Sequence, residues 1–350
     1  MVSEVDNPVC SPPLVSVVVL TCNGREHLGE CLGSLLDQTW PRLEIVLVVN
    51  GSSDGSAAYV RERFGEAVRV LELEHNLGYT GGNNRGISAT SGRYVCLLND
   101  DTRVEPAWVE EMVKVIESRP RCGMVACKIL SYDQPGIIDN VGHVVYRDGT
   151  FRGRGRLEQD RGQYDRVEEV LSPSGCAMMV RRCALDESGC FDEDFFIYGD
   201  DAELSLRLRL AGWKTFSAPA AVVRHKYSAS TGAYSPFKAF LVERNRIWIT
   251  IKYFPPGALW AAPAFAAWRL FLQAWGVVAG KGAAGEFARQ HSAWHLPVIL
   301  IKAHFAAARR LPRMWAKRRL LRRTRRVADV EFYRWLRRYG MTARELAWKK

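Results

Sequence analysis

The sequence predicts an α/β fold with a mostly parallel sheet, helices on both faces of that sheet, and a helical region at the C-terminal end. Short β-branched runs alternate with amphipathic helical patterns over the first hundred residues, as in chains that form parallel sheets. Polar turns follow these strands, and the composition after Tyr234 shifts to Trp, Ala and Arg. Together these observations place a ligand site at the carboxyl edge of the sheet.

The predicted strands and helices follow one another in regular order. Residues 15–20 form a strand that ends in the turn 21–24, and residues 25–38 carry apolar side chains at the spacing of an amphipathic helix. Between 131 and 169 the periodicity is lost, which indicates either a long excursion over the site or a mobile loop. The remaining predictions are strands at 44–49, 68–73, 94–98 and 176–180, a short strand before residue 225, and helices at 57–64, 80–90 and from 200 onward.

The bulk composition narrows the functional classes. The net charge is +11, but residues 301–350 hold 17 Lys and Arg against 3 Asp and Glu. The whole chain has 49 Lys and Arg and 38 Asp and Glu, so residues 1–300 hold 32 basic and 35 acidic residues and are slightly acidic. The positive charge therefore lies at the C-terminal end, and no nucleic-acid partner is expected. The nine cysteines form no C-x-x-C pair, and Met1–Pro13 lacks the pattern of a signal peptide, which predicts a reducing, cytoplasmic location.

Two adjacent carboxylates, Asp100 and Asp101, come directly after the buried strand 94–98 and Asn99. A strand of this kind delivers its last residues to the ligand crevice of an α/β sheet. Hard oxygen ligands there suit Mg²⁺ or Mn²⁺ beside a diphosphate. The alternative is an Asp-rich turn without a ligand.

A glycine-rich segment, residues 76–86, precedes and opens the third helix. Its glycines allow a ligand to approach the main chain closely, and Arg85 offers a fixed cation for an anion. The alternative for such a segment is ordinary helix capping.

A second acidic group lies about a hundred residues further along the chain. Asp200 and Asp201 begin a helical pattern, where the helix dipole stabilises a carboxylate. Asp200 is as consistent with a helix cap as with function, and Asp201 is the better candidate for a base. His225 follows a predicted strand, and an isolated histidine is more often structural than a ligand.

These segments, taken together, resemble the family 2 inverting glycosyltransferases of GT-A fold, in particular the rhamnosyltransferase-like branch. The resemblance covers roughly the first two thirds of the chain. The matching motifs are Val15-Ser-Val-Val-Val-Leu-Thr-Cys-Asn-Gly24, Asn50-Gly-Ser-Ser-Asp-Gly-Ser56, Asn76-Leu-Gly-Tyr-Thr-Gly-Gly-Asn-Asn-Arg-Gly86, Leu98-Asn-Asp-Asp-Thr102, Gly189-Cys-Phe-Asp-Glu-Asp-Phe-Phe196 and Gly212-Trp213.

The resemblance implies a role for each matching residue. Asp101 would bind the metal, His225 would complete the metal shell, and Asp201 would be the general base, with Asp200 in place of the usual Glu. Asp100 would lie near the ribose and the metal. The residues expected around the nucleotide sugar are Thr21, Asn23, Val49, Asn50, Asp54, Asn76, Gly78, Gly81, Arg85, Asn99 and Asp100.

One of these positions departs from the family pattern. An acidic residue usually precedes Asn-Gly-Ser and reads the imide N–H of the base, but this chain has Val49 there. Because valine accepts no hydrogen bond, we expect a relaxed selectivity for the nucleotide base.

The function implied is transfer of a sugar, with inversion, from a nucleotide-sugar donor to a saccharide or lipid-linked acceptor of cell-envelope polysaccharide synthesis. The branch suggests deoxythymidine diphosphate rhamnose as donor. Galactofuranosyl and hexosaminyl transferases share the motifs, and a non-catalytic protein that binds nucleotide sugars or nucleic acid is the alternative from another class.

The chain is expected to divide into a GT-A catalytic part at 1–233, with a nucleotide-sugar half at 1–104 and an acceptor half at 105–233, and a helical part at 234–350.

Residues 257–280 approach transmembrane length but are interrupted, so an interfacial or buried helix fits them better than a span. Residues 309–326 hold ten basic residues and no acid. Through 257–326 the protein is expected to lie on anionic lipid at the inner face of the cell membrane, the alternatives being a solvated helix face or nucleic acid.

Overall fold

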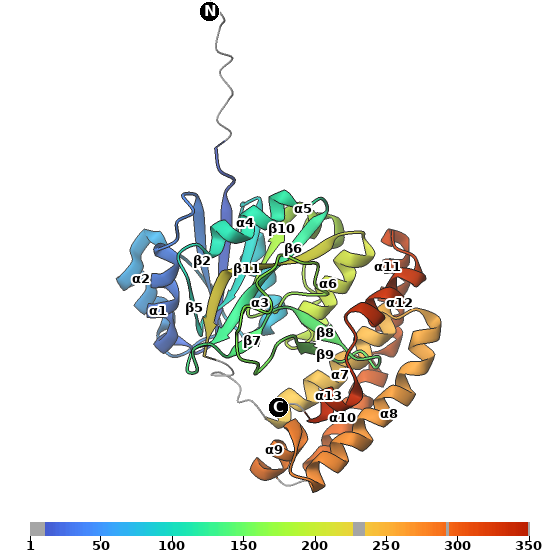
Figure 1. Ribbon diagram of the computed structural model, residues 1–350. Coiled ribbons are helices and arrows are strands. Elements are labelled where there is room, and N and C mark those ends of the chain that lie inside the picture. The colour runs from blue at the N-terminus through green and yellow to red at the C-terminus, as the bar shows by residue number, and fades with distance from the viewer. Residues whose placement is uncertain (1–10, 227–234, 292–293, 349–350) are drawn as a thin grey trace, which may run out of the picture.

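The computed structural model describes residues 11–226, 235–291 and 294–348 (Figure 1). Among these residues, nine strands form one sheet in the order β3-β2-β1-β4-β10-β6-β11-β5, and β7 pairs with β6. The segment Met1–Cys10, part of the region interpreted as lacking a signal peptide, lies outside the described residues, as does the expected boundary at 233.

The first half of the sheet follows the predicted alternation of strands and helices. Strand β1 pairs in parallel with β2 and β4, and β2 pairs in parallel with β3, so the carboxyl ends of these four strands share one edge. The predicted elements are present here, with ends shifted by at most two residues. The bounds are β1 Val15–Thr21, α1 Arg25–Leu36, β2 Leu43–Asn50, α2 Ser56–Phe64, β3 Arg69–Leu73, α3 Gly78–Ser88 and β4 Tyr94–Asn99.

The second half of the sheet is mixed. Strand β10 lies antiparallel between β4 and β6, whereas β11 runs parallel to β6 and carries β5 antiparallel on its other side. The β5–β11 pairing sets His225 opposite Thr102, next to the turn that holds Asp100 and Asp101. The bounds are β5 Thr102–Val104, α4 Trp108–Ser118, β6 Cys122–Ser131, β10 Ala177–Arg181, α5 Arg182–Ser188, α6 Asp200–Leu210 and β11 Lys214–His225.

Helices cover both faces of the sheet. On one face α1, α2 and α4 bury residues such as Leu32, Val60 and Trp108 against alternate strand positions. On the other face α3, α5 and α6 bury Ile87 and Leu204 among others. The run of apolar residues in each central strand is therefore explained by contact with helices on both sides.

The segment 131–169, for which the sequence left two alternatives open, is an excursion with its own short strands. Strand β7 (Ile138–Asn140) joins the large sheet, while β8 (His143–Val145) and β9 (Phe151–Gly153) form a separate antiparallel pair. Because β7 pairs with β6 and β8 is hydrogen-bonded to Ser172, this excursion passes beside the edge of the sheet.

The C-terminal helices pack against the far side of α6, so that α6 lies between the sheet and the helical region. Ala202 and Leu206 of α6 share a core with Trp248, Phe254 and Phe332. No helix of the described residues is long and apolar enough to cross a bilayer. The bounds are α7 Pro236–Tyr253, α8 Pro256–Val278, α9 Gly282–Gln290, α10 His295–Arg309, α11 Leu311–Thr324, α12 Asp329–Arg338 and α13 Ala343–Trp348.

Candidate functional site

The turn after β4 brings two carboxylates against the end of β1. Thr21 Oγ1 donates a hydrogen bond of 2.5 Å to Asp100 Oδ2, across the parallel β1–β4 pair. A Cβ at position 24 would lie 2.0 Å from the same oxygen, so Gly24 is needed for this contact. Burial, together with the adjacent Asp101, raises the pKa of Asp100 to about 7.

Asp101 lies between main-chain and imidazole partners. His225 Nε2 lies 3.4 Å from Asp101 Oδ1, and the N–H of Lys226 donates to the main-chain oxygen of Asp101 at 3.0 Å. Burial opposes ionisation of Asp101, but the hydrogen bond and charge of His225 outweigh it and hold the pKa of the carboxyl below its usual value. This carboxyl is therefore ionised at neutral pH.

A third residue, Asp139, orients the imidazole from its other side. His225 Nδ1 lies 2.7 Å from Asp139 Oδ2, and Asp139 Oδ1 is paired with Arg156 at 2.9 Å. Burial lowers the pKa of His225, yet Cys176, Asp101 and Asp139 together raise it well above the usual value. The contact with Asp139 orients the ring so that Nε2 faces Asp101, which is the arrangement that second-shell carboxylates give to metal-binding histidines, and a bound cation would take the place of the Nε2 proton.

The residues present at this turn fit a cation only in part. Apart from the 3.4 Å contact with His225 Nε2, the buried Oδ1 of Asp101 accepts no hydrogen bond from the described residues, which leaves lone-pair capacity for a cation. Within the described part of the chain, however, no group of three or more His, Cys, Asp and Glu side chains is arranged to hold one. Asp101 and His225 would thus be the protein ligands of a hard cation whose other ligands come from elsewhere.

The asparagines expected around the nucleotide bind each other. Asn50 Nδ2 donates to Asn76 Oδ1 and to the Gly78 carbonyl, both at 3.1 Å, and Asn50 Oδ1 accepts from the Leu77 N–H at 2.9 Å. Gly78 has a φ of +71°, and a Cβ there would lie 2.5 Å from the Phe196 carbonyl oxygen. These residues shape the start of α3 and leave few free polar groups for a ligand.

Asn23 and Asp54 join the turns that follow β1 and β2. Asn23 Oδ1 accepts from the Ser53 N–H at 2.8 Å, and Asp54 accepts from the N–H groups of Arg25 and Ser56. Burial opposes ionisation of the Asp54 carboxyl, but its hydrogen bonds with Ser56 and Arg25 outweigh burial and lower its pKa. A cavity of about 440 Å³ opens beside these turns. It is lined by Asn23, Arg25, Glu26, Asp54 and Tyr59.

The other expected donor-binding residues occupy different surroundings. Val49 is buried in the apolar core and lies in register with Thr21, so it offers the base no acceptor. Gly81 is buried inside α3 against Leu77. Arg85 is exposed, lies about 10 Å along α3 from Gly78, and pairs with Glu193 at 3.7 Å.

The start of α6 carries the second acidic pair. Asp201 Oδ2 accepts from the Gly175 N–H at 2.9 Å, and Oδ1 accepts from the Ala202 N–H at 2.7 Å. His143 Nε2, from β8, lies 3.8 Å from Asp201 Oδ2. Asp200 is buried, and that burial together with the neighbouring Asp201 raises its pKa well above the usual value.

Two consecutive residues connect the acidic pairs. Gly175 binds Asp201, while the next residue, Cys176, accepts the Asn99 N–H at its carbonyl and places its thiol beside His225. Because consecutive Cα atoms are only 3.8 Å apart, Asp201 lies close to the turn that holds Asp100 and Asp101. The structure thus brings together the three distant segments that the sequence singled out.

Several residues of this site were not found from the sequence. Asp139 and His143 lie in the segment without periodicity, so no pattern marked them. Gly175 and Tyr79 were also missed. Tyr79 donates to the Gly175 carbonyl at 2.6 Å, and its burial beside Asp200 and Asp201 raises its pKa.

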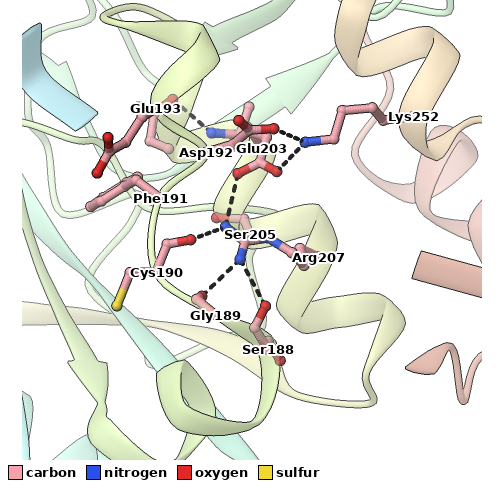
Figure 2. A network of polar contacts seen from close by, with 12 residues as sticks. Ser188, Gly189, Cys190, Phe191, Asp192, Glu193, Glu203, Ser205, Arg207 and Lys252 are labelled. Atoms are coloured by element: carbon pink, nitrogen blue, oxygen red, sulfur yellow. Dashed lines mark hydrogen bonds and ion pairs between the residues drawn. The ribbon is translucent and has the colours of Figure 1, made fainter. Parts of the chain in front are cut away.

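Other acidic residues of the same stretch form a structural network, shown in Figure 2. Lys252 Nζ binds Asp192 Oδ2 and Glu203 Oε1, each at 2.6 Å, and Arg207 donates to Glu203 and to the carbonyls of Ser188 and Gly189. Lys252 and Lys317 outweigh the burial of Asp192 and lower its pKa to about 2. This network joins α6 to the C-terminal helices α7 and α11.

The comparisons with known proteins agree on one family. A family model described as "Glycosyl transferase family 2" matches residues 16–189. The chain is 31% identical over 236 residues to O-antigen biosynthesis protein RfbC of Myxococcus xanthus, which covers 65% of this chain but only 18% of RfbC. It is 30% identical over 243 residues to N-acetylglucosaminyl-diphospho-decaprenol L-rhamnosyltransferase of Mycobacterium tuberculosis, covering 63% of this chain and 78% of the relative.

Solved structures share the fold at lower identity. The mannosyltransferase PcManGT of Pyrobaculum calidifontis, in complex with GDP-Man and Mn²⁺, superposes with a TM-score of 0.53 at 18% identity and covers 85% of this chain and 88% of its own. TarS 1–349 of S. aureus, in complex with UDP-GlcNAc, gives 0.52 at 19% identity and covers 92% and 89%. The predicted GT-A architecture is confirmed.

Proposed function

We propose that this chain, which belongs to glycosyl transferase family 2, transfers a sugar from a nucleoside diphosphate donor to a saccharide or lipid-linked acceptor, with inversion at the anomeric carbon. The observation that carries the proposal is the meeting of Asp101, His225 and Asp201 at one edge of the sheet, joined by Gly175 and Cys176. An ionised carboxylate with an imidazole suits a cation, and a second carboxylate nearby suits a base.

The donor diphosphate would lie beside Asp101 and His225. These two side chains would hold Mg²⁺ or Mn²⁺, which when bound neutralises charge on the departing diphosphate. Asp139 keeps the His225 ring in place from the other side. The assignment is supported by the buried Oδ1 of Asp101, which lies 3.4 Å from His225 Nε2, so both atoms could face one cation.

Asp201 would act as the general base. The acceptor hydroxyl oxygen forms a bond to the anomeric carbon, the bond from that carbon to the diphosphate breaks, and the hydroxyl proton passes to the Asp201 carboxylate. The N–H groups of Gly175 and Ala202 orient this carboxylate, and burial beside it raises the pKa of Asp200. A single displacement of this kind inverts the anomeric configuration.

For the donor we propose deoxythymidine diphosphate rhamnose. The support is the Mycobacterium tuberculosis relative, whose name states rhamnosyl transfer. A galactofuranosyl or hexosaminyl donor is the alternative within the family. Since Val49 is buried and offers no acceptor, we expect pyrimidine and purine nucleoside diphosphates to inhibit with similar strength, and strict pyrimidine discrimination would contradict this.

For the acceptor side we propose a lipid-linked or saccharide acceptor of cell-envelope polysaccharide synthesis, used at the cytoplasmic face of the cell membrane. The names of both relatives support this setting. Residues 257–326 would meet the anionic membrane surface, with no nucleic acid as partner. Part of the basic stretch 309–326 is used inside the protein, because Arg313 and Lys317 bind Asp194 and Arg318 donates to the Ile251 carbonyl.

The test is transfer from a panel of sugar nucleotides with Mn²⁺, with and without a chelator. Asp201→Asn should lower transfer by about a thousandfold, as expected for loss of a general base. The same variant should keep the donor-induced rise in thermal midpoint. Asp186→Asn, an exposed aspartate on α5, is the matched control and should behave as wild type.

Two outcomes would contradict the proposal. Undiminished turnover by Asp201→Asn would remove Asp201 from the role of base. A donor-induced midpoint shift without transfer to any acceptor of the panel would instead favour the non-catalytic nucleotide-sugar binding protein.

A further inference from the structure

Helix α8 exposes a stripe of large apolar side chains, which we name the α8 stripe. Trp260 and Val278 at its two ends are 82% and 84% exposed, and the three residues between them are each more than half exposed. At 3.6 residues per turn, all five lie within an arc of about 80°. The α8 stripe consists of Trp260, Trp268, Phe271, Trp275 and Val278.

The opposite face of α8 is the one that packs against the protein. It buries small residues, Ala258, Ala262, Ala266 and Gly276, and one cation, Arg269. Arg269 binds Asp148 at 2.6 Å and Glu243 at 2.8 Å, so this face is fixed to the excursion and to α7. A surface helix ordinarily places its large apolar residues inward, and α8 does the reverse.

One ring contact orders part of the α8 stripe. The rings of Trp268 and Phe271 stack at 5.5 Å with an interplanar angle of 16°. In Figure 1, α8 lies on the outer side of the helical region, away from the sheet. Helix α10, which packs against α7, also exposes Ile301 and Phe305. Patches of this kind mark surfaces that bind a partner.

The positive charge of the helical region indicates what kind of partner would bind the α8 stripe. Between Glu243 and Asp329 the chain has 17 Lys and Arg but only one acid, Glu286. Some of these cations are used internally, whereas Lys281, Lys302 and Arg309 are exposed. A second copy of this chain would bring the same cations to the interface, which disfavours self-association. An anionic surface is complementary.

We propose that the α8 stripe docks this protein on an anionic lipid bilayer, with α8 lying in the interfacial region and its tryptophans at the level of the headgroups. Apolar insertion by α8 is then the main anchor, and the arginines of α11 contribute less than their number suggests. The inference rests on the proposed function in one respect, the lipid-linked acceptor that membrane docking would bring within reach. Binding to lipid itself is independent of catalysis.

The experiment measures partition of the full-length chain onto vesicles of phosphatidylglycerol and phosphatidylethanolamine by flotation. The triple variant Trp260→Ser, Trp268→Ser, Trp275→Ser should bind at least about tenfold more weakly, since each change removes apolar area. Leu36→Ser, which removes an exposed leucine on α1, should bind as wild type. The pair Arg322→Gln and Arg323→Gln should reduce binding less than the triple variant does.

Two further measurements keep the test independent of folding and of catalysis. Brominated acyl chains should quench the tryptophan fluorescence of the unmodified chain. The donor-induced rise in thermal midpoint should be equal in wild type and the triple variant, so a failure of donor binding or of transfer would count against the proposed function and not against docking.

The docking proposal is overturned if the wild type does not float with these vesicles or if the brominated lipids leave its fluorescence unchanged. It is also overturned if the triple variant binds as wild type. Conversion of a wild-type dimer to a monomer by the triple variant, with unchanged vesicle binding, would assign the stripe to self-association instead.

Discussion

The turn at Asp100–Asp101 and the start of α6 at Asp200–Asp201 place the same pair of residues in two different surroundings. In the turn, His225 faces Asp101 and lowers its pKa, while Asp100 accepts hydrogen bonds from Thr21 and the main chain, and burial raises its pKa to about 7. In the helix, main-chain N–H groups hold Asp201, while Asp200 is buried and its pKa is raised.

In both pairs the pKa of the first carboxyl is raised. The cause is the same in each case, because burial and the charge of the adjacent carboxylate both disfavour ionisation of that first carboxyl. The difference lies in the partner. A histidine beside Asp101 suits a shared cation, and main-chain donors around Asp201 suit an oriented base with a free lone pair for a proton.

The strongest test of this comparison replaces each aspartate of the first pair in turn by asparagine. Asp101→Asn should lower metal-dependent transfer by about a thousandfold, because a cation contributes several kcal/mol to the departure of the diphosphate. Asp100→Asn should cost only about tenfold, since that carboxyl is already partly neutral. Steady-state rates at saturating donor and Mn²⁺ measure both, and equal losses would contradict the assignment.

Asp139 offers a way to sharpen the role of the imidazole. Asp139→Asn weakens the acceptor for His225 Nδ1 and should lower Mn²⁺ affinity in the presence of nucleoside diphosphate by about 10- to 100-fold. Calorimetric titration provides the measurement. Asp133→Asn, an exposed aspartate of the same segment, is the control and should leave the affinity unchanged. An unaltered affinity in Asp139→Asn would show that the contact is structural only.

The second pair has its own histidine, His143, at 3.8 Å from Asp201. We expect it to position the base, with its other ring nitrogen 3.3 Å from Ser172 Oγ. His143→Gln should lower kcat by about tenfold and leave the donor KM unchanged, because the proposed donor-binding residues lie on the other side of Gly175. His304→Gln, an exposed histidine on α10, serves as control. A change in donor KM without a change in kcat would contradict this role.

How much of the site the sequence predicts depends on the kind of pattern that carries each residue. Asp100, Asp101 and Asp201 follow a strand or open a helix, and such positions can be found from local periodicity together with the parallel arrangement of the sheet. His225 is a candidate because two acidic groups accompany it, and the family resemblance implies its place in the metal shell. The structure explains why His225 lies near Asp101: the antiparallel pairing of β5 with β11 places His225 opposite Thr102, the residue after Asp101.

Asp139 and His143 could not be predicted in this way. Their positions result from the pairing of β7 with β6 and of β8 with β9, between short strands in a segment that has no period of its own. Conversely, Asn50 and Asn76 carry the right chemistry for a nucleotide, but they bind each other and the start of α3. A sequence pattern indicates which groups are polar, and tertiary contacts decide which of them remain available.

The smallest expected effect is on stability and tests the raised pKa of Asp100. The folded-state pKa of about 7 lies above the ordinary value of 3.8, so the folded state holds a proton that the unfolded chain releases. Folding is therefore penalised progressively as pH rises from 3.8 to 7, and the penalty is complete above 7. Asp100→Asn should raise the thermal midpoint by a few degrees at pH 8 and hardly at all near pH 4, measured without divalent cations. A stabilisation that is equal at both pH values would mean that relief of charge is not its cause.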